Sequence, residues 1–457
     1  MNNPENKRLN DSAAVRWAAL LIVAFTMMAA YYVNDVMAPL KSMLESNLHW
    51  TSGEYGFFTG AYSFLNVFLL MLIWGGLILD RFGIRFTGIL SAVLMVGGTA
   101  CEYVAITHLG GTAQTLFGYK LDVFLASAGY SVFGVGAEVA GITVSKIIAK
   151  WFQGKEMALA MGVQVALARI GSQAAYAVAL PVAKQWHLDM PLFIGLVLLV
   201  GGLISFLCFA LMDRKLDRQL TTTIKDTTDD KFSFRDVLAV VSNPGFWLIA
   251  LLCVLFYSCV FPFQKFATEL MVTKYNVSED IAGTFAGLPA LGALFLTPVF
   301  GGMIDKKGKS ASIMALGAAM LIFVHAIFAI PSIHASWVAI SLMIILGIAF
   351  SLVPSAMWPA VAKIFPVKQL GTAYALIFFI QNIGLWGVPV LIGEVLERCC
   401  IVRQTTVGND IINLYDYTLP QCIFTAIALL SLCIAFMLKR ADKKHDYGLE
   451  TPNMRKM

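Results

Sequence analysis

Long apolar stretches alternate with short polar segments along almost the whole chain, and this pattern predicts its architecture. Each stretch has roughly twenty or more predominantly apolar residues, enough for a helix to cross a hydrocarbon layer about 30 Å thick. The segment before the first stretch lacks the features of a cleavable signal, so we expect the first helix to be retained. The pattern predicts an all-α polytopic membrane protein with twelve transmembrane helices, at about 15–38, 55–79, 86–107, 119–149, 157–183, 190–212, 244–272, 280–303, 310–331, 335–362, 369–395 and 418–438.

Composition agrees with the pattern and argues against an enzyme. Of the 457 residues, 58% are hydrophobic and only 13% are charged, which is unlike a soluble domain. The sequence has no HExxH or GxSxG motif, no glycine-rich phosphate loop and no Cys/His spacing typical of a metal site. We therefore expect no catalytic residues, no metal and no cofactor.

The distribution of Lys and Arg predicts the orientation in the bilayer. Basic residues concentrate in the terminal segments and in alternate loops, and the positive-inside rule then places both termini in the cytoplasm. The net charge of +5 is explained by these loops facing anionic lipid, so we expect a lipid bilayer and no nucleic acid as a partner.

Two internal matches predict that the chain is made of two related halves. The segment GLILDRFGIR around Asp80 is matched 225 positions later by GGMIDKKGKS around Asp305, and 149–155 matches 362–368 at an offset of 213. We expect six-helix bundles at 1–212 and 243–440, a cytoplasmic connector at 213–242 and a cytoplasmic tail at 441–457. In membrane transporters built from two such repeats, the substrate site lies near the bilayer midplane, where the halves meet.

Glu138 and Arg169 are the candidates for that site, because each is a charge in the middle of an apolar stretch. They flank the short turn 151–156 at nearly equal separations, which places both roughly 23 Å from it at about 1.5 Å per residue. Opposite charges at one depth suit a zwitterionic solute. The alternative is a structural ion pair, in which the two side chains only neutralise each other.

The second half offers a different set of side chains at the matching positions. The 213 offset places Arg169 on Asn382 and Glu138 on Ser351, with Gln381 and Trp358 nearby. Trp358 precedes a proline, so its alternative role is packing at a helix kink. We also expect Asp35 to lie at a solvated rim, and Lys265 to pair with Glu269 four residues away on one helix.

The motif at Asp80 has features of a conformational gate. Gly83 allows a tight turn, and Asp80 and Arg81 at the end of a helix can change partners between two states. This motif, with its weaker copy at Asp305, resembles the cytoplasmic gating motif of the major facilitator superfamily. The resemblance implies a two-bundle, twelve-helix fold and transport by alternating access.

A narrower resemblance covers most of the chain. The segments 134–172, 256–263 and 356–376 and the pair Gln381-Asn382 are similar to the family of lysosomal dipeptide uniporters within that superfamily. The resemblance implies that Glu138 binds the α-amine of a dipeptide, Arg169 its carboxylate and Trp358 its side chains or peptide plane. Tyr257 and Gln381 are implied less directly. A forked guanidinium does match a carboxylate in two places, and a carboxylate does bind an ammonium.

The sequence leaves several functional alternatives open. The first helix lacks the ExxER-type cluster of proton-coupled peptide transporters, which favours uniport over symport with protons. An organic-anion, dicarboxylate or phosphate-ester exchanger, and a peptide-binding receptor or scaffold, are the other readings. No acidic dileucine signal is visible at the amino terminus, so we expect a bacterial-type cytoplasmic membrane rather than a lysosome. We expect a monomer, with the need for an accessory subunit open.

Overall fold

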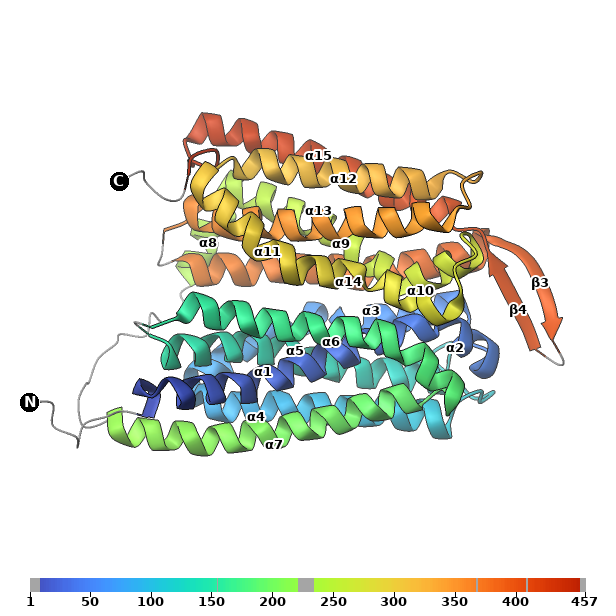
Figure 1. Ribbon diagram of the computed structural model, residues 1–457, viewed down its shortest axis with the longest axis horizontal. Helices are drawn as coiled ribbons and strands as arrows, with labels where there is room; N and C mark the ends of the chain where they lie inside the picture. The colour runs from blue at the N-terminus through green and yellow to red at the C-terminus, as the bar shows by residue number, and fades with distance from the viewer. Residues whose placement is uncertain (1–8, 154, 221–233, 367–368, 408–409, 453–457) are drawn as a thin grey trace, which may run out of the picture.

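The computed structural model describes residues 9–153, 155–220, 234–366, 369–407 and 410–452, and most of them lie in long helices that run side by side (Figure 1). The first set of elements, up to residue 220, is η2 (Leu9–Asp11), α1 (Ala13–Val36), η3 (Ala38–Leu40), α2 (Lys41–Leu48), α3 (Ser52–Phe68), α4 (Met71–His108), β1 (Thr115–Leu116), β2 (Tyr119–Lys120), α5 (Leu121–Trp151), α6 (Met157–Gln185) and α7 (Met190–Leu220). The second set is α8 (Phe234–Val241), α9 (Pro244–Thr273), α10 (Glu279–Ala286), α11 (Leu288–Lys307), α12 (Ser310–Ala329), α13 (Ser336–Ile364), α14 (Leu370–Cys399), β3 (Ile401–Val407), β4 (Asp410–Tyr415) and α15 (Thr418–His445).

Within the described residues, eleven helical segments are long and apolar enough to cross a membrane. The difference from the twelve predicted spans arises around 55–79. There the chain forms α3, only 17 residues long, and then continues into the start of α4 after Leu70 adopts a left-handed conformation. The helical path of α4 is broken again at Gly83, whose φ of 78° and ψ of 174° suit only glycine. The second predicted span is therefore α3 plus the first turns of α4, and the twelve-helix architecture is consistent with the structure.

The helices pack as two bundles, which lie in the lower and upper parts of Figure 1. In the first bundle, α4 packs on α5 and α7, and α1 packs on α6 and α7. In the second, α12 packs on α15 and α13, while α9 packs on α14 and α15. The bundles join through α3 against α14 and through α6 against α10 and α11. The segment 213–242, expected as a connector, contains the end of α7 and α8, and its residues 221–233 lie outside the described residues.

The two ends of the molecule differ (Figure 1). One end, here called the terminus end, carries both chain termini. The other, the hairpin end, carries the antiparallel pair β3–β4, which projects beyond the helices. A second, two-residue pair, β1–β2, precedes α5. The apolar pattern did not predict either hairpin, because both lie in the polar segments between helices.

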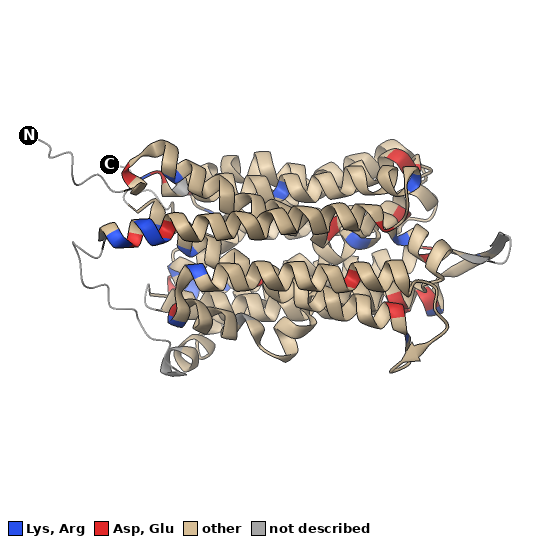
Figure 2. Cartoon of the chain, turned by 90° about the horizontal axis from the view of Figure 1, so that it is seen from below, with Lys and Arg blue, Asp and Glu red and all other residues tan. Residues whose placement is uncertain are grey.

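The charge pattern agrees with a membrane protein. Figure 2 shows acidic and basic residues concentrated toward the two ends, with few charges along the helix middles. Large apolar side chains such as Trp74, Leu159, Phe295 and Leu430 are more than half exposed on the helices. A surface of this kind is stable against lipid rather than water.

Candidate functional site

Glu138 lies on α5, about midway between the two ends of that helix, and is half-buried. Its carboxylate accepts a hydrogen bond from the Tyr62 hydroxyl on α3 at 3.1 Å. Tyr62 is held in place by ring contacts with Tyr130 and Phe133. A carboxylate with one fixed donor keeps further acceptor positions for a ligand.

Arg169 lies midway along α6 and is also half-buried. Its guanidinium carbon lies 5.4 Å from the ring centroid of Tyr31 on α1 and 4.9 Å from that of Phe350 on α13. Since α13 belongs to the second bundle, Arg169 lies at the interface between the two bundles. Its buried Nε has no hydrogen-bond partner in the described part of the chain, so the cation has donors left for a ligand.

Among the ion pairs of the described residues, none joins Glu138 to Arg169. The reason lies in the packing: α6 lies mainly along α1, and α1 brings the Tyr31 ring up to the guanidinium. Each charge is therefore held by aromatic neighbours instead of by the other. A structural ion pair, the alternative raised by the sequence, is not formed in this conformation.

The second bundle contributes an aromatic wall. The Trp358 indole nitrogen donates to the Tyr257 hydroxyl at 3.3 Å, and the Trp358 ring stacks on Phe378 with centroids 4.8 Å apart. Phe350 lies edge-on to Tyr257, with centroids 6.2 Å apart. Because Phe350 also contacts the Arg169 guanidinium, the wall begins at the cation and continues toward Trp358.

Gln381 and Asn382 are buried, with 8% and 1% of their surface exposed. Gln381 accepts a contact from the Cys253 thiol on α9 at 3.4 Å, and the Asn382 amide donates to the Phe378 carbonyl one turn earlier at 3.0 Å. The Asn382 Oδ1 is buried without a partner in the described residues. In this conformation both residues lie at the packed face between α9 and α14.

The residues predicted to form a gate in the first bundle lie at the terminus end. Asp80 accepts from the Lys146 ammonium on α5 at 2.7 Å, and its side chain is 63% exposed. Arg81 lies over the Phe82 ring, and Gly83 forms the helix break described above. Asp80 is thus bonded within its own bundle in this state.

The weaker copy at Asp305 is covered by the end of the chain. Gly308, with a φ of 71°, meets the backbone of residues 450–452. The Glu450 carboxylate accepts from the Ser312 backbone and hydroxyl, both at 2.8 Å, and Leu449 is fully buried. The last residues of the tail, 453–457, lie outside the described residues.

Two local predictions at the hairpin end are wrong. Asp35 is only 8% exposed and forms an ion pair with Lys265 at 2.9 Å, so it is not a solvated rim residue. Lys265 and Glu269 do not pair with each other: Glu269 pairs with Lys41 at 2.5 Å. Each of the two pairs with a residue of the first bundle, because that bundle's opposite charges lie closer than the next turn of the same helix.

Sequence reasoning missed the neutral residues that hold the charged pair. Tyr62, Phe350 and the role of Tyr31 carry no sequence signal of their own, since an aromatic residue in an apolar helix is ordinary. It also missed the buried charges Lys41 and Glu45. These two have the spacing i, i+4 of a helical ion pair and follow the first apolar stretch, which is a signal that could have found them.

Comparisons with known proteins agree with this architecture. The family model described as Major Facilitator Superfamily matches residues 20–387. The chain is 30% identical over 443 residues to the human protein named lysosomal dipeptide transporter MFSD1, covering 94% of this chain and 87% of that protein. It is also 30% identical over 444 residues to the mouse protein of the same name, covering 94% and 88%.

Solved structures share the fold at low sequence identity. The nucleoside transporter NupG superposes with a TM-score of 0.69 at 14% identity, covering 92% of this chain and 99% of that one. An inward-facing, occupied bacterial homologue of the human lysosomal transporter Spinster superposes with a TM-score of 0.68 at 13% identity, covering 95% and 98%. The family match, the relatives at 30% identity and the shared fold show that the chain belongs to the major facilitator superfamily.

Proposed function

We propose that this transporter carries dipeptides across its membrane by alternating access, as a uniporter. Glu138 binds the α-ammonium group of the dipeptide and Arg169 its carboxylate. Tyr257 and Trp358 pack against the side chains or the peptide plane. Gln381 and Asn382 complete the site from α14 when α9 and α14 move relative to the first bundle.

The observation that carries this proposal is that the two charges do not neutralise each other. Both are half-buried midway along their helices, and each keeps unused hydrogen-bonding capacity. An unpaired carboxylate and an unpaired guanidinium at one depth suit a solute with one charge of each sign. The relatives named as dipeptide transporters support the same choice of solute.

The structure also supports a direction for the open side. The polar contacts that join the bundles cluster at the hairpin end, including Ser52 to Glu397 at 3.0 Å and the Tyr55 hydroxyl to the Lys265 carbonyl at 2.8 Å. At the terminus end, Asp80 bonds within its own bundle. With both termini in the cytoplasm, as the basic residues predict, this is a state closed to the outside and open inward.

Ligand-induced thermal stabilisation of the purified protein tests the site. A ligand that binds only the folded protein raises its apparent stability by mass action. Dipeptides should stabilise the wild type, whereas single amino acids, tripeptides and dicarboxylates should not. Glu138→Gln and Arg169→Ala should remove the response, and Arg169→Lys should restore little of it because the two-pronged contact is lost. Glu156→Gln, which alters a carboxylate paired with Arg16 at the terminus end, is the matched control.

Each contrary result points to one alternative. Stabilisation by dicarboxylates that survives Glu138→Gln would assign the site to an anion exchanger. If Glu138→Gln and Arg169→Ala both keep the ligand response of the wild type, then Glu138 and Arg169 have only a structural role. Dipeptide binding without uptake into vesicles would identify a receptor or scaffold.

We also propose that the protein acts as a monomer in a bacterial-type cytoplasmic membrane, since one chain provides residues from both bundles for the whole site. Mass measurement in detergent tests the first point. Modification by an impermeant reagent on intact cells tests the orientation, with cysteines introduced at Lys444 and Ser332 after the exposed native cysteines are replaced by serine. Only the cysteine at Ser332 should react from outside.

A further inference from the structure

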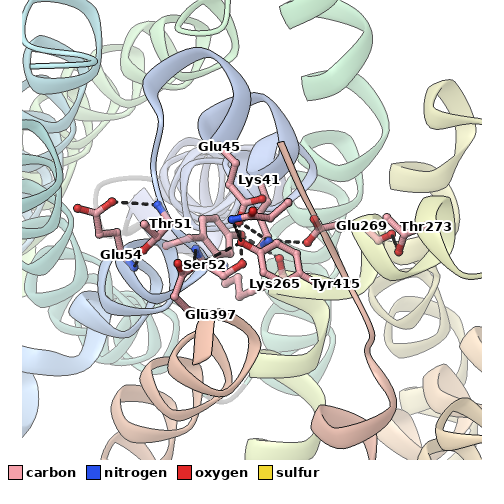
Figure 3. Close-up of polar contacts among 12 residues, drawn as sticks. Lys41, Glu45, Thr51, Ser52, Glu54, Lys265, Glu269, Thr273, Glu397 and Tyr415 are labelled. Carbon is pink, nitrogen blue, oxygen red and sulfur yellow. Dashed lines mark hydrogen bonds and ion pairs between the residues drawn. The ribbon is translucent and has the colours of Figure 1, made fainter. Parts of the chain in front are cut away.

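A cluster of buried charges spans the two bundles at the hairpin end, and the proposed dipeptide site does not use it (Figure 3). Lys41 begins α2, and its ammonium lies 2.6 Å from Glu45 and 2.5 Å from Glu269 on α9. The Lys41 side chain is 1% exposed, and the two carboxylates are 8% and 5% exposed. Closing this end therefore takes one cation and two carboxylates out of water together.

The neighbouring groups satisfy hydrogen bonds without adding a compensating charge. The Ser52 hydroxyl donates to Glu45 at 2.7 Å, and the Tyr417 hydroxyl donates to Glu269. The Tyr415 ring, on β4, lies 4.7 Å from the Lys41 ammonium. All of these groups except the lysine are neutral or acidic.

Other charges near the cluster are already engaged. Lys265 is paired with Asp35, which makes a neutral unit, and Glu397 accepts from the Ser52 backbone at 3.0 Å. Glu54 pairs with Lys120 at 3.2 Å. His49, at the end of α2, lines the same pocket as Glu45, so His49 and Glu397 are further titratable groups near the cluster.

With both carboxylates ionised, the three groups carry a net charge of −1 in a buried place. Two carboxylates that share one cation repel each other, and desolvation penalises the surplus charge. One proton removes the surplus. The molecule then keeps a neutral hydrogen-bonded carboxyl group beside a Lys–Glu pair.

Glu45 is better placed than Glu269 to take that proton. Both hydrogen bonds to its carboxylate, from Lys41 and Ser52, reach Oε1, which leaves Oε2 for the proton. Glu45 also lines an open pocket of about 420 Å³ at the hairpin end, together with His49, Trp50 and Tyr415. Water on that side thus has a route to Glu45 that Glu269 does not share.

We propose that Lys41, Glu45 and Glu269 form a proton-binding site, loaded from the hairpin side, that holds its proton when this end is closed and releases it when the bundles separate. The inference does not depend on the identity of the transported solute. On opening, both carboxylates regain water and Glu45 ionises. Acid on the hairpin side then favours the closed conformation, because the proton binds that state more tightly.

The test measures the opening of the hairpin end as a function of pH, without substrate. Spin labels at Gln114 and Ser332, exposed positions in loops of the two bundles, report the separation by pulsed electron resonance. The exposed native cysteines are first replaced by serine; they are Cys101, Cys208, Cys399, Cys422 and Cys433. In the wild type, the ratio of open to closed molecules should rise between about pH 5 and pH 9, by at most tenfold per pH unit for one proton.

Three variants and one control variant predict distinct pH responses. Glu45→Gln, which is permanently neutral, should stay closed across the whole range. Glu269→Gln removes the surplus charge from the other side and should also lose the response, so the conclusion does not rest on one variant folding. Lys41→Met leaves two carboxylates without a cation, and closure should then require more acid. Asp189→Asn, which alters a carboxylate bonded to Thr107 within the first bundle, should respond as the wild type does.

Other outcomes overturn the proposal. A wild type whose ratio does not change with pH has no such site. A pH response that persists in Glu45→Gln assigns the proton to another group. If that response is also lost in His49→Gln, the group is His49. Failure of dipeptides to stabilise the protein bears only on the proposed solute, because these measurements contain no ligand.

Discussion

Single side chains in this protein hold charges in place without neutralising them. Glu138 is oriented by one tyrosine hydroxyl, and Arg169 lies between the rings of Tyr31 and Phe350. Aromatic faces stabilise a cation by their quadrupole but leave its N–H donors available. The same arrangement would be unsuitable for a permanent structural ion pair, which needs direct contact to offset desolvation.

Removing the Tyr62 hydroxyl should weaken dipeptide binding while leaving the fold intact. A hydrogen bond to a charged group contributes about 1.5–3 kcal/mol, which corresponds to roughly a 10- to 100-fold loss of affinity in Tyr62→Phe. The remaining ring keeps its contacts with Tyr130 and Phe133, so thermal stability without ligand should change little. Calorimetric titration with a dipeptide measures the loss.

Tyr103→Phe provides the matched control, because its ring packs on Phe193 with centroids 5.5 Å apart, away from the charged pair. Equal affinities of Tyr62→Phe and the wild type would show that the carboxylate needs no orienting donor.

The close contact between α3 and α14, which joins the two bundles, depends on glycine. A Cβ added at Gly56 on α3 would lie 2.5 Å from the Pro389 carbonyl oxygen and 2.9 Å from the Cα of Gly393 on α14. Together with Gly60 this forms a GxxxG segment, which lets helix backbones approach closely. The closed hairpin end therefore requires glycine at these positions of α3 and α14.

Gly56→Ala should shift the molecule toward the state that is open at the hairpin end. The added methyl group cannot be accommodated without separating α3 from α14, whereas the open state is unaffected. Spin-label distances at Gln114 and Ser332 would report the shift. Gly387→Ala on α14, where an added Cβ meets nothing within 4 Å, should leave the distances unchanged and slightly stabilise the helix. Identical distances in the two variants would contradict the role of this contact.

The tail after α15 acts as an element that fastens the terminus end of the second bundle. Glu450→Ala removes the carboxylate that caps the start of α12 and should lower the free energy of unfolding by about 1 kcal/mol. Lys444→Ala, at an exposed position of α15, should have no such effect. Thermal unfolding in detergent compares the two, and an unchanged midpoint for Glu450→Ala would show that this carboxylate cap does not stabilise the protein.

At the scale of the whole molecule, the strongest polar contacts between the two bundles among the described residues lie at the hairpin end. This asymmetry is what alternating access requires, because each end must be able to close while the other is open. For a uniporter, the solute gradient alone drives the cycle.

Vesicles containing the protein should take up a labelled dipeptide until the concentrations inside and outside are equal, and no further. Unlabelled dipeptide inside should accelerate entry of the label, since return of the loaded protein replaces return of the empty one. An imposed pH gradient should change the rate but not the final level. Accumulation above the outside concentration, driven by that gradient, would instead identify symport with protons.

The sequence predicted the helices well because a bilayer imposes a length and an apolar composition on every span. It also singled out Glu138 and Arg169, since charges are costly in such spans. It could not predict Tyr62 or Phe350 as their neighbours, because Tyr62 reaches Glu138 from α3 and Phe350 reaches Arg169 from α13, which belongs to the other bundle. The expected Lys265–Glu269 pair failed for the same reason: spacing along one helix says nothing about a stronger partner on another.

The burial of Lys41, Glu45, Glu269, Asp35 and Lys265 has a consequence for the temperature dependence of the conformational equilibrium. The free-energy cost of removing charged groups from water falls as temperature rises, because their hydration carries a negative entropy. Closure of the hairpin end should therefore absorb heat and gain entropy. Warming would shift the resting protein toward the conformation that is closed at the hairpin end and open at the terminus end. Cooling would shift it toward the conformation that is open at the hairpin end.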